Sequence, residues 1–463
     1  MPPLRPYHVA IVGSGPSGYF AAASLLKSAA SDSGGTAARD VRVDMLEMLP
    51  TPWGLVRSGV APDHPKIKSI SNQFDKTSGD PRFRFFGNIE VGNHVHPAEL
   101  AERYDAVIYA IGAQSDRELG IPGEDLPGSV AAVDFVGWYN AHPHFEEISP
   151  DISGGRAVVV GNGNVAIDVA RILVSDPDVL AETDIADHAL QSLHARGVDE
   201  VLIIGRRGPL QAPFTTLELR ELGALEGLGD VDVIVDPEDF ADITEEDLEA
   251  AGKTVRNNIK VLRGYADVSP QEAKRRIVFR FRTSPIEIRG AGKVESIVLG
   301  RNQLITGPDG RVSAKDTGER EEVPAQLVVR AVGYRGLPTP GLPFDERSAT
   351  IPHDEGRITG SRNEYVVGWI KRGPTGVIGS NKKDSQDTVD TLLEDLQTAE
   401  LAEFGADHAE EIQRWLQQRQ PHLVTNDHWK LLDEYERNAG QGSGRPRVKV
   451  TSVAEMLRVV GHN

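Results

Sequence analysis

A glycine turn near the start of the chain is the feature that most constrains the fold. Residues 9–12 are four consecutive apolar residues, which is typical of a strand covered on both faces. Three glycines follow: Gly13 permits a sharp turn, Gly15 lets a pyrophosphate approach the backbone, and Gly18 lets the next helix pack against the sheet. The first amides of that helix favour an anion. Residues 8–26 therefore predict a dinucleotide-binding turn in an α/β fold.

The same pattern recurs from residue 156. An apolar run at 157–160 is followed by Gly161, Gly163 and Ala166, in the spacing of the first three glycines. Alanine is an accepted third residue in such turns. The sequence therefore predicts two dinucleotide-binding units in one chain.

The residues that end the second strand of each unit distinguish the two ligands. The predicted strand 41–47 ends in Glu47, whose carboxylate suits the hydroxyls of a ribose. The predicted strand 200–204 is followed by Arg206 and Arg207, which can bind a 2′-phosphate through charge-assisted hydrogen bonds. A surface glutamate and a solvated arginine pair are the alternative interpretations. The contrast predicts FAD at the first turn, and NADP rather than NAD at the second.

Composition excludes several classes of protein. The chain has 463 residues, enough for two or three domains, and no cysteine, which excludes disulfides, a cysteine-ligated iron–sulfur cluster and a redox-active cysteine pair. Its net charge of −19 argues against nonspecific binding to nucleic acids or anionic membranes. No apolar run is long enough to span a membrane, and we expect no metal. The first strand begins within eight residues, so we expect no targeting peptide and a cytoplasmic location.

The segments between these motifs read as loops, strands and helices of an ordinary α/β protein. We expect a surface loop at 28–40, an irregular segment held against a ligand at 48–64, a helix at 66–76 and a strand pair at 83–91. A buried strand at 104–113, a helical insert at 175–199 and antiparallel strands at 230–330 follow. The stretch 326–335 is expected to return the chain to the first domain. Residues 363–379 predict a strand, a glycine-rich loop and the start of a helix. The last 60 residues predict helices, and no catalytic or binding residue is evident in them.

Taken together, five stretches resemble the adrenodoxin-reductase-type ferredoxin–NADP⁺ reductases, especially their mycobacterial members. They are residues 13–18, 52–64, 161–166, 205–207 and 368–379. The resemblance implies an α/β fold of two Rossmann-like dinucleotide-binding domains, with the NADP domain inserted into a discontinuous FAD domain. The FAD domain would comprise 1–115 and 334–463, and the NADP domain 116–333.

The resemblance also implies binding residues for each cofactor. Non-covalent FAD would be held by Gly13, Gly15, Ser17, Gly18, Glu47, Leu55, Val91, Trp369, Gly376, Val377 and Ile378. NADP(H) would be held by Arg117, Asn162, Gly163, Asn164, Val165, Arg206, Arg207, Glu218 and Gly376.

The implied activity is that of an FAD-dependent NADPH:ferredoxin oxidoreductase. NADPH would deliver hydride to flavin N5, and the reduced flavin would pass single electrons, reversibly, to a ferredoxin-type iron–sulfur protein. No protein nucleophile is needed. His64 and Glu221 are candidates for proton handling, although a histidine in a turn and a surface glutamate explain them equally well.

An acidic ferredoxin requires a local basic patch on a chain that is acidic overall. Two sets of residues are candidates: Lys66, Lys68, Arg82 and Arg84, or Lys371, Arg372, Lys382 and Lys383.

Three other functions share parts of this pattern. A pyridine nucleotide–disulfide reductase is set aside because the chain has no cysteine. A flavin monooxygenase or NADPH oxidase, with oxygen as acceptor, remains open. So does a non-catalytic module that binds NADP or flavin.

Overall fold

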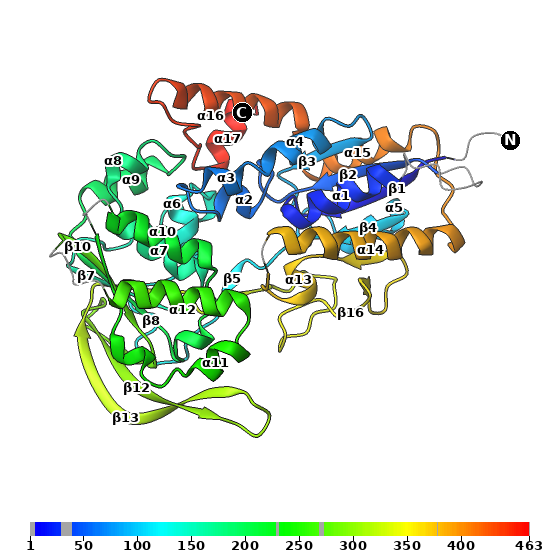
Figure 1. The fold of residues 1–463 in the computed structure, drawn as a ribbon. Coiled ribbons are helices and arrows are strands. Elements are labelled where there is room, and N and C mark those ends of the chain that lie inside the picture. The colour runs from blue at the N-terminus through cyan, green and yellow to red at the C-terminus, as the bar shows by residue number, and fades with distance from the viewer. Residues whose placement is uncertain (1–4, 29–38, 228–230, 268–272, 377, 463) are drawn as a thin grey trace. The chain divides into compact units, whose positions relative to one another are not determined.

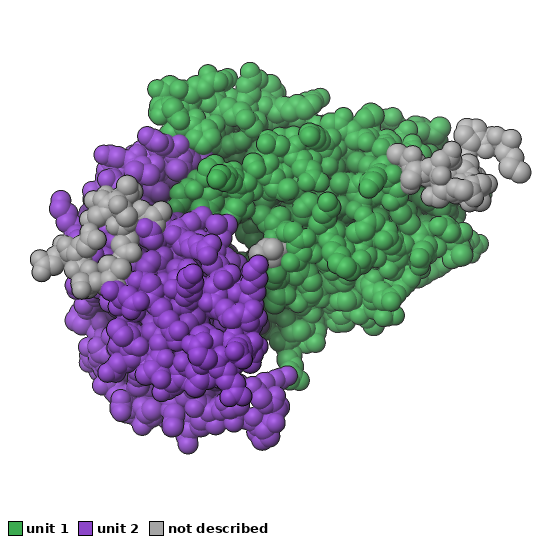
Figure 2. Space-filling view, in the orientation of Figure 1, with its two compact units in different colours: residues 1–115, 334–463 green, residues 116–333 purple. Residues whose placement is uncertain are grey.

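The chain folds into two compact units. The structure is a computed structural model that describes residues 5–28, 39–227, 231–267, 273–376 and 378–462. Unit 1 comprises Met1–Ser115 and Tyr334–Asn463, and unit 2 comprises Asp116–Gly333 (Figure 2). Among the described residues, no helix is both long and apolar enough to cross a bilayer.

Unit 1 is built on an eight-stranded sheet whose centre is the strand of the first glycine turn. All six residues of β1 (Tyr7–Val12) are buried, as the apolar run predicts for a strand covered on both faces. It lies between β2 (Val41–Leu46) and β4 (Ala106–Tyr109), both parallel to it. The full order is β16-β17-β18-β4-β1-β2-β3-β19. The other strands are β3 (Phe83–Gly87), β16 (His353–Asp354), β17 (Arg357–Ile358), β18 (Glu364–Val366) and β19 (Val424–Thr425).

Helices cover this sheet (Figure 1). The crossover helix α1 (Pro16–Ser28) packs against α14 (Ile378–Thr398) and α4 (Ser71–Ser78). The remaining helices of unit 1 are α2 (Leu55–Ser58), α3 (Pro65–Lys68), α5 (Pro97–Arg103), α13 (Trp369–Arg372), α15 (His408–Arg419), α16 (Asn426–Gln441) and α17 (Val453–Val459).

Three local predictions for unit 1 are wrong. The segment 48–64 is not irregular throughout, because it contains α2. The single helix expected at 66–76 is two helices, α3 and α4; Ser69 Oγ donates to the carbonyl of Lys66 at 2.6 Å, and such local bonds compete with continued helix. The strand pair expected at 83–91 is β3 alone, which ends before Asn88, a residue in the left-handed region at φ 62°. The loop expected at 28–40 lies largely outside the described residues.

Unit 2 carries a second parallel sheet in the order β6-β14-β7-β8-β10-β9. Strand β7 (Arg156–Val160) leads into the second glycine turn and pairs with β8 (Glu200–Ile204) and β14 (Leu327–Arg330). Strand β10 (Arg275–Arg280) is parallel to β8, whereas this stretch was expected to be antiparallel. The expectation holds for β11 (Thr283–Arg289), β12 (Ser296–Thr306) and β13 (Val312–Pro324), which form a three-stranded antiparallel sheet.

Helices pack on one face of this sheet and the antiparallel strands β11 to β13 pack on the other, and the remaining elements of unit 2 are as follows. They are α6 (Ala132–Tyr139), α7 (Asn164–Val174), α8 (Pro177–Leu180), α9 (Asp187–His194), α10 (Thr216–Gly227), α11 (Glu245–Ala250), α12 (Lys253–Ala266), β6 (Ser129–Ala131), β9 (Val231–Ile234) and three 3₁₀ turns at Pro143–Phe145, Pro209–Gln211 and Pro237–Phe240. Short strands β5 (Ser115–Asp116) and β15 (Tyr334–Arg335) form a two-stranded sheet.

Buried His8 in β1 makes the stability of unit 1 depend on pH. Burial is the main cause that lowers the pKa of His8 to about 4; the nearby charge of Asp44 opposes this shift, and that of His408 adds to it. An unfolded chain takes up a proton on this ring near pH 6.5, whereas the folded chain does not until about pH 4. This contribution to stability is therefore present above pH 6.5 and is lost as the pH falls from 6.5 to about 4.

We expect His8→Gln to reduce this pH dependence. Between pH 7 and pH 5, the midpoint of thermal unfolding should fall by about 2–4 °C more in the unaltered chain than in the variant. Equal falls in the two proteins would show that His8 is not responsible.

Candidate functional site

The first glycine turn brings two strands so close that side chains are excluded. Gly13 has φ +102°, and a Cβ there would lie 2.5 Å from the carbonyl oxygen of Ala110, which follows β4. A Cβ on Gly18 would lie 2.2 Å from the carbonyl oxygen of Gly13. A Cβ on Gly15, in contrast, would meet no described atom within 4 Å. The turn therefore leaves open space beside the backbone of Gly15, as a pyrophosphate requires.

The carboxylate of Glu47 lies at the edge of this turn. Its Oε2 accepts hydrogen bonds from the backbone N–H of Ser14 at 2.9 Å and from the Ser14 hydroxyl at 2.6 Å. Its Oε1 accepts from the N–H of Leu49 at 3.1 Å. A carboxylate has about four acceptor positions, so the group is fixed in place and can still accept from a ribose hydroxyl.

The segment that follows Glu47 lies directly on the glycine turn. The N–H of Trp53 donates to the carbonyl of Ser14 at 3.0 Å, and a Cβ on Gly54 would lie 3.0 Å from Cα of Gly15. Helix α2 begins at the next residue, Leu55. Trp53 itself adopts φ +85°, which is unfavourable for a bulky side chain. Such strain is often found where the backbone is held around a ligand.

Three indole N–H groups in unit 1 are buried without an acceptor in the described part of the chain, those of Trp53, Trp369 and Trp415. Two of them, Nε1 of Trp53 and Nε1 of Trp369, belong to segments that were expected at a ligand. Trp369 begins α13, and its ring lies 5.4 Å from that of Tyr334. A buried donor without an acceptor destabilises the fold unless a bound group accepts its hydrogen bond. Together with the space beside Gly15 and the fixed carboxylate of Glu47, these donors fit a polar dinucleotide such as FAD.

The other residues expected at FAD also belong to unit 1. Ser17 is buried in α1, and its carbonyl accepts from the Ser385 hydroxyl at 3.0 Å. Val91 follows β3 and forms an isolated bridge with Val95. Ile378 is the first residue of α14 and lies two residues after Gly376, and Val377 between them lies outside the described residues.

The second glycine turn repeats the geometry of the first within unit 2. Gly161 has φ +121°, and a Cβ there would lie 2.2 Å from the carbonyl oxygen of Ala331, which follows β14. Gly163 precedes α7, and Asn164 Oδ1 accepts from the N–H of Thr215 at 2.7 Å. Asn162 and Val165 lie on either side of these two residues. The N-terminus of α7 is thus positioned as the N-terminus of α1 is.

Arg206 and Arg207 follow β8, and their backbone is held by the antiparallel sheet. The carbonyl of Arg206 accepts from Asn302 Nδ2 at 3.0 Å, and that of Arg207 from the N–H of Arg282 at 2.9 Å. Within the described ranges, neither guanidinium has a carboxylate partner. Arg117, the third cation expected at NADP, donates its N–H to the carbonyl of Gly333 at 3.2 Å. Sequence reasoning missed the supporting Asn302 and Arg282, because nothing in their spacing indicates this contact.

Glu218 and Glu221 belong to a buried charge cluster between α10 and α7. Arg171 lies 3.8 Å from Glu218, 3.7 Å from Glu221 and 2.8 Å from Asp168. Burial raises the pKa of Glu218 above its ordinary value; the charges of Asp168 and Glu221 add to this, and Arg171 opposes it. The cluster therefore favours a protonated Glu218. Asp168 and Arg171 were not predicted, although their spacing on one helix face could have indicated them.

His64, the other candidate for proton handling, lies in unit 1. It is buried and precedes α3, and its carbonyl accepts from the N–H groups of Ile67 and Lys68 at 3.1 Å each. His64 and Glu221 thus lie in different units of the chain.

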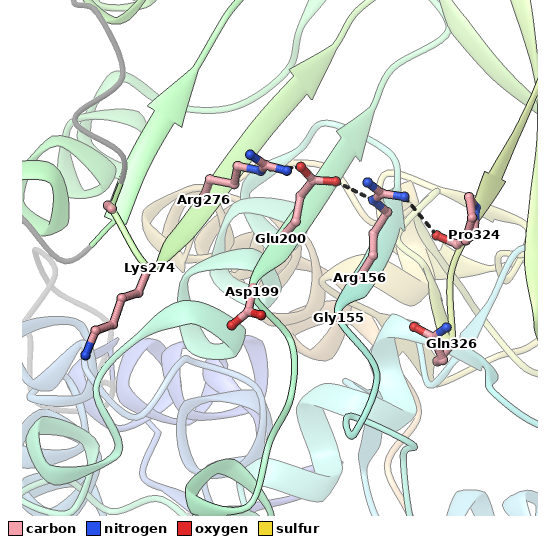
Figure 3. A pocket seen from close by; sticks show the side chains of 9 residues that line it. Gly155, Arg156, Asp199, Glu200, Lys274, Arg276, Pro324 and Gln326 are labelled. Atoms are coloured by element: carbon pink, nitrogen blue, oxygen red, sulfur yellow. Dashed lines mark hydrogen bonds and ion pairs between the residues drawn. The ribbon is translucent and has the colours of Figure 1, made fainter.

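A hollow of about 460 Å³ in unit 2 lies at the opposite ends of the strands (Figure 3). The carboxylate of Glu200, at the start of β8, is paired with Arg156 of β7 and with Arg276 of β10. Asp199 and Lys274 also line it. Since the glycine turn follows the carboxyl end of β7, this hollow has no part in the dinucleotide site.

Comparison with known proteins agrees with this geometry. A family model described as pyridine nucleotide-disulphide oxidoreductase matches residues 7–221. The chain is 70% identical to NADPH-ferredoxin reductase FprA of Mycobacterium tuberculosis over 460 residues, which cover 98% of this chain and 99% of that protein. It is 41% identical to the mitochondrial NADPH:adrenodoxin oxidoreductase of Salvelinus fontinalis, covering 97% and 90% of the two chains. The solved structure of Mycobacterium tuberculosis FprA in complex with NADPH matches with a TM-score of 0.95 and 70% identity, over 98% of this chain and 100% of that one.

The fold and the two turns define an oxidoreductase that binds two dinucleotides, which confirms the predicted fold class. The resemblance is confirmed as well: the chain belongs to the NADPH–ferredoxin reductase family, which is related to the adrenodoxin reductases.

Substitutions at two of the three glycines of the first turn, Gly15 and Gly18, should have different effects. Gly18→Ala should lower the unfolding temperature of the apoprotein, because its Cβ would collide with the Gly13 carbonyl. Gly15→Ala should leave that temperature within about 2 °C, since its Cβ enters open space, but weaken FAD binding by about tenfold or more. Thermal unfolding and titration of apoprotein with FAD measure both. If Gly15→Ala binds FAD as tightly as the unaltered chain does, the cofactor does not bind at this turn.

Proposed function

We propose that this chain is an FAD-dependent NADPH:ferredoxin oxidoreductase, with FAD bound by unit 1 and NADP(H) by unit 2. The observation that carries the proposal is the pair of matching glycine turns with opposite charges beside them, Glu47 at one and Arg206 with Arg207 at the other. The relatives named NADPH-ferredoxin reductase and NADPH:adrenodoxin oxidoreductase support it. We also propose a cytoplasmic location, which is consistent with the similarity to the bacterial relative.

The residues of this chain bind and orient the cofactors rather than form bonds to substrate. Bound FAD supplies the chemistry, accepting hydride from NADPH and releasing electrons one at a time. Glu47 would bind the ribose of FAD, and the amides beyond Gly15 would bind its pyrophosphate. The indole N–H groups of Trp53 and Trp369 would donate hydrogen bonds to its polar atoms. With no cysteine in the chain, the dithiol step of the disulfide reductases has no residues to perform it.

The assignment of NADP is tested at Arg206 and Arg207. Replacing both by Gln should lower kcat/KM for NADPH by about 100-fold and leave that for NADH within about threefold, because charge-assisted bonds to the 2′-phosphate are lost. Lys253→Gln, at an exposed residue of the same unit, is the control. An unchanged preference for NADPH would refute the assignment.

The electron acceptor distinguishes the proposal from an oxidase or a binding module. Stopped-flow mixing with NADPH under anaerobic conditions should bleach the flavin, which a binding module would not do. In air, NADPH consumption should become fast only when ferredoxin and cytochrome c are added. Rapid peroxide formation without ferredoxin would favour the oxidase.

We also propose that His64 and Glu221 handle protons during turnover. Both are buried or half-buried, and Glu221 is part of the cluster around Arg171. His64→Gln and Glu221→Gln should each change the shape of the pH profile of NADPH-dependent ferricyanide reduction. Profiles that are merely scaled down, with the same shape, would assign both residues a structural role.

Ion pairs within unit 1 reduce the number of basic side chains that are available to bind an acidic ferredoxin. Arg82 pairs with Asp80, Arg84 with Asp44, Lys371 with Asp384, and Lys383 with Asp387. Arg372 lies 3.7 Å from Asp384, and Lys68 is half-buried. Lys382 is exposed and has no ion pair among the described residues. Lys66 and Lys76 are exposed and line a hollow of about 600 Å³ that also includes Ile378, the first residue of α14. We propose that ferredoxin binds here, close in sequence to residues expected at FAD.

Charge reversal tests this docking surface. Lys66→Glu with Lys76→Glu should raise the KM for ferredoxin by about 5–10-fold and leave the rate with ferricyanide unchanged, since only the protein acceptor needs the patch. Lys430→Glu, at an exposed residue of α16, serves as the matched control. If the double variant and the control have the same KM, ferredoxin docks elsewhere.

A further inference from the structure

A buried charge network in unit 1 joins the loop at the first glycine turn to the C-terminal segment. Glu436, in α16 (red in Figure 1), is fully buried. Its carboxylate accepts two hydrogen bonds from Arg57 of α2, Nη1 to Oε2 at 2.8 Å and Nη2 to Oε1 at 2.5 Å. It also accepts from Arg447 at 3.2 Å and from the N–H of Val450 at 2.9 Å.

The electrostatics of this carboxylate depend on both arginines. Burial acts to raise the pKa of Glu436, but the charge and hydrogen bonds of Arg57, together with Arg447 and the N–H of Val450, hold it below its ordinary value. Arg447 is bound in turn by Asp433 at 2.6 Å. A buried ion pair of this kind is costly to break, because the remaining charge is left without a partner.

Residues of this network contact the loop that lies on the glycine turn. The ring of Trp53 packs edge-on against that of Trp429, with 5.1 Å between centroids. The guanidinium of Arg447 lies 5.3 Å from the Trp53 ring, and that of Arg57 lies 5.5 Å from the Trp429 ring. Lys449 Nζ donates to the carbonyl of Arg57 at 3.0 Å. The loop is therefore held by side chains from one C-terminal segment.

The loop requires such support because its local conformation is unfavourable. Trp53 has a left-handed backbone, and α2 is only four residues long, too short to be stable as an isolated helix. Such conformations persist where the surroundings impose them. The C-terminal segment reaches the loop because Gly440 lets the chain fold back over α16: a Cβ there would lie 2.7 Å from the carbonyl oxygen of Arg445.

We propose that residues 426–450 are a positioning element of the FAD site, in which Glu436 and Arg447 hold the loop of Trp53 and Leu55 against the cofactor. This inference rests on the proposed binding of FAD at the first turn. It gives the C-terminal helices a role that the sequence did not indicate. The network contributes to FAD affinity and to the surroundings of the bound flavin, in addition to any contribution to stability.

The test compares two buried carboxylate–arginine pairs of unit 1. Glu436→Gln disturbs the network, and Asp105→Asn is the matched control, because Asp105 is buried and accepts two hydrogen bonds from Arg5 at 2.7 Å each. FAD dissociation constants are measured by titrating the full-length apoproteins, with flavin fluorescence as readout. Visible circular dichroism of the holoproteins reports the surroundings of the flavin, and thermal unfolding of the apoproteins reports stability.

We expect Glu436→Gln to raise the FAD dissociation constant by about tenfold and to alter the visible circular dichroism. Asp105→Asn should lower the unfolding temperature and leave both flavin readouts unchanged. A double variant, Arg57→Met with Glu436→Met, replaces the pair by apolar side chains and should restore stability without restoring FAD affinity.

Unchanged FAD affinity and dichroism in both network variants would overturn the inference and leave the network a structural role only. Equal losses of affinity in Glu436→Gln and Asp105→Asn would overturn it as well, since affinity would then follow stability alone. Failure of the unaltered apoprotein to take up FAD is a different outcome, because it would refute the proposed function itself.

Discussion

The contact on which the rest of the structure depends is the close approach of two backbones at the carboxyl end of each sheet. In unit 1, the N–H of Ala110 donates to the carbonyl of Val12 at 2.7 Å, and Gly13 then turns against the Ala110 carbonyl. In unit 2, the N–H of Ala331 donates to the carbonyl of Val160 at 2.7 Å, and Gly161 turns in the same way. Each turn aims a helix N-terminus at the space beside the sheet. Only glycine tolerates this approach, so both dinucleotide sites follow from these two residues.

Hydrogen bonds hold the charged residue beside each turn in position. The carboxylate of Glu47 is bound by the backbone and hydroxyl of Ser14, so it cannot turn away from the glycine turn. The arginines are held differently: Asn302 and Arg282 bind their carbonyls and leave both guanidiniums available to an anion. In the proposed sites, discrimination between the two dinucleotides depends on residues that follow the second strand of each unit, and other hydrogen bonds hold their backbone.

The sequence predicts those parts of the fold that local chemistry dictates. The α/β class and the two turns follow from apolar runs and glycine spacing, because these features act within a few residues. The break between α3 and α4 was missed, since the Ser69 hydroxyl bond that accompanies it has no distinct signal. The parallel pairing of β10 was missed because the residue pattern of a single short strand does not indicate the direction of its neighbour. Glu436 and Arg57 pair across 379 residues, a separation at which one sequence gives no warning of contact.

The division of unit 1 between the two ends of the chain has a consequence for its biosynthesis. Strands β1 to β4 leave the ribosome first, and unit 2 follows as an uninterrupted stretch that can fold as it is made. Strand β18, helix α14 and the carboxylate of Glu436 are made afterwards. Until then, half of the first sheet has an uncovered edge at β4, and Arg57 has no carboxylate from α16. Maturation of unit 1 is therefore a late event, completed only once the last helices have been synthesised.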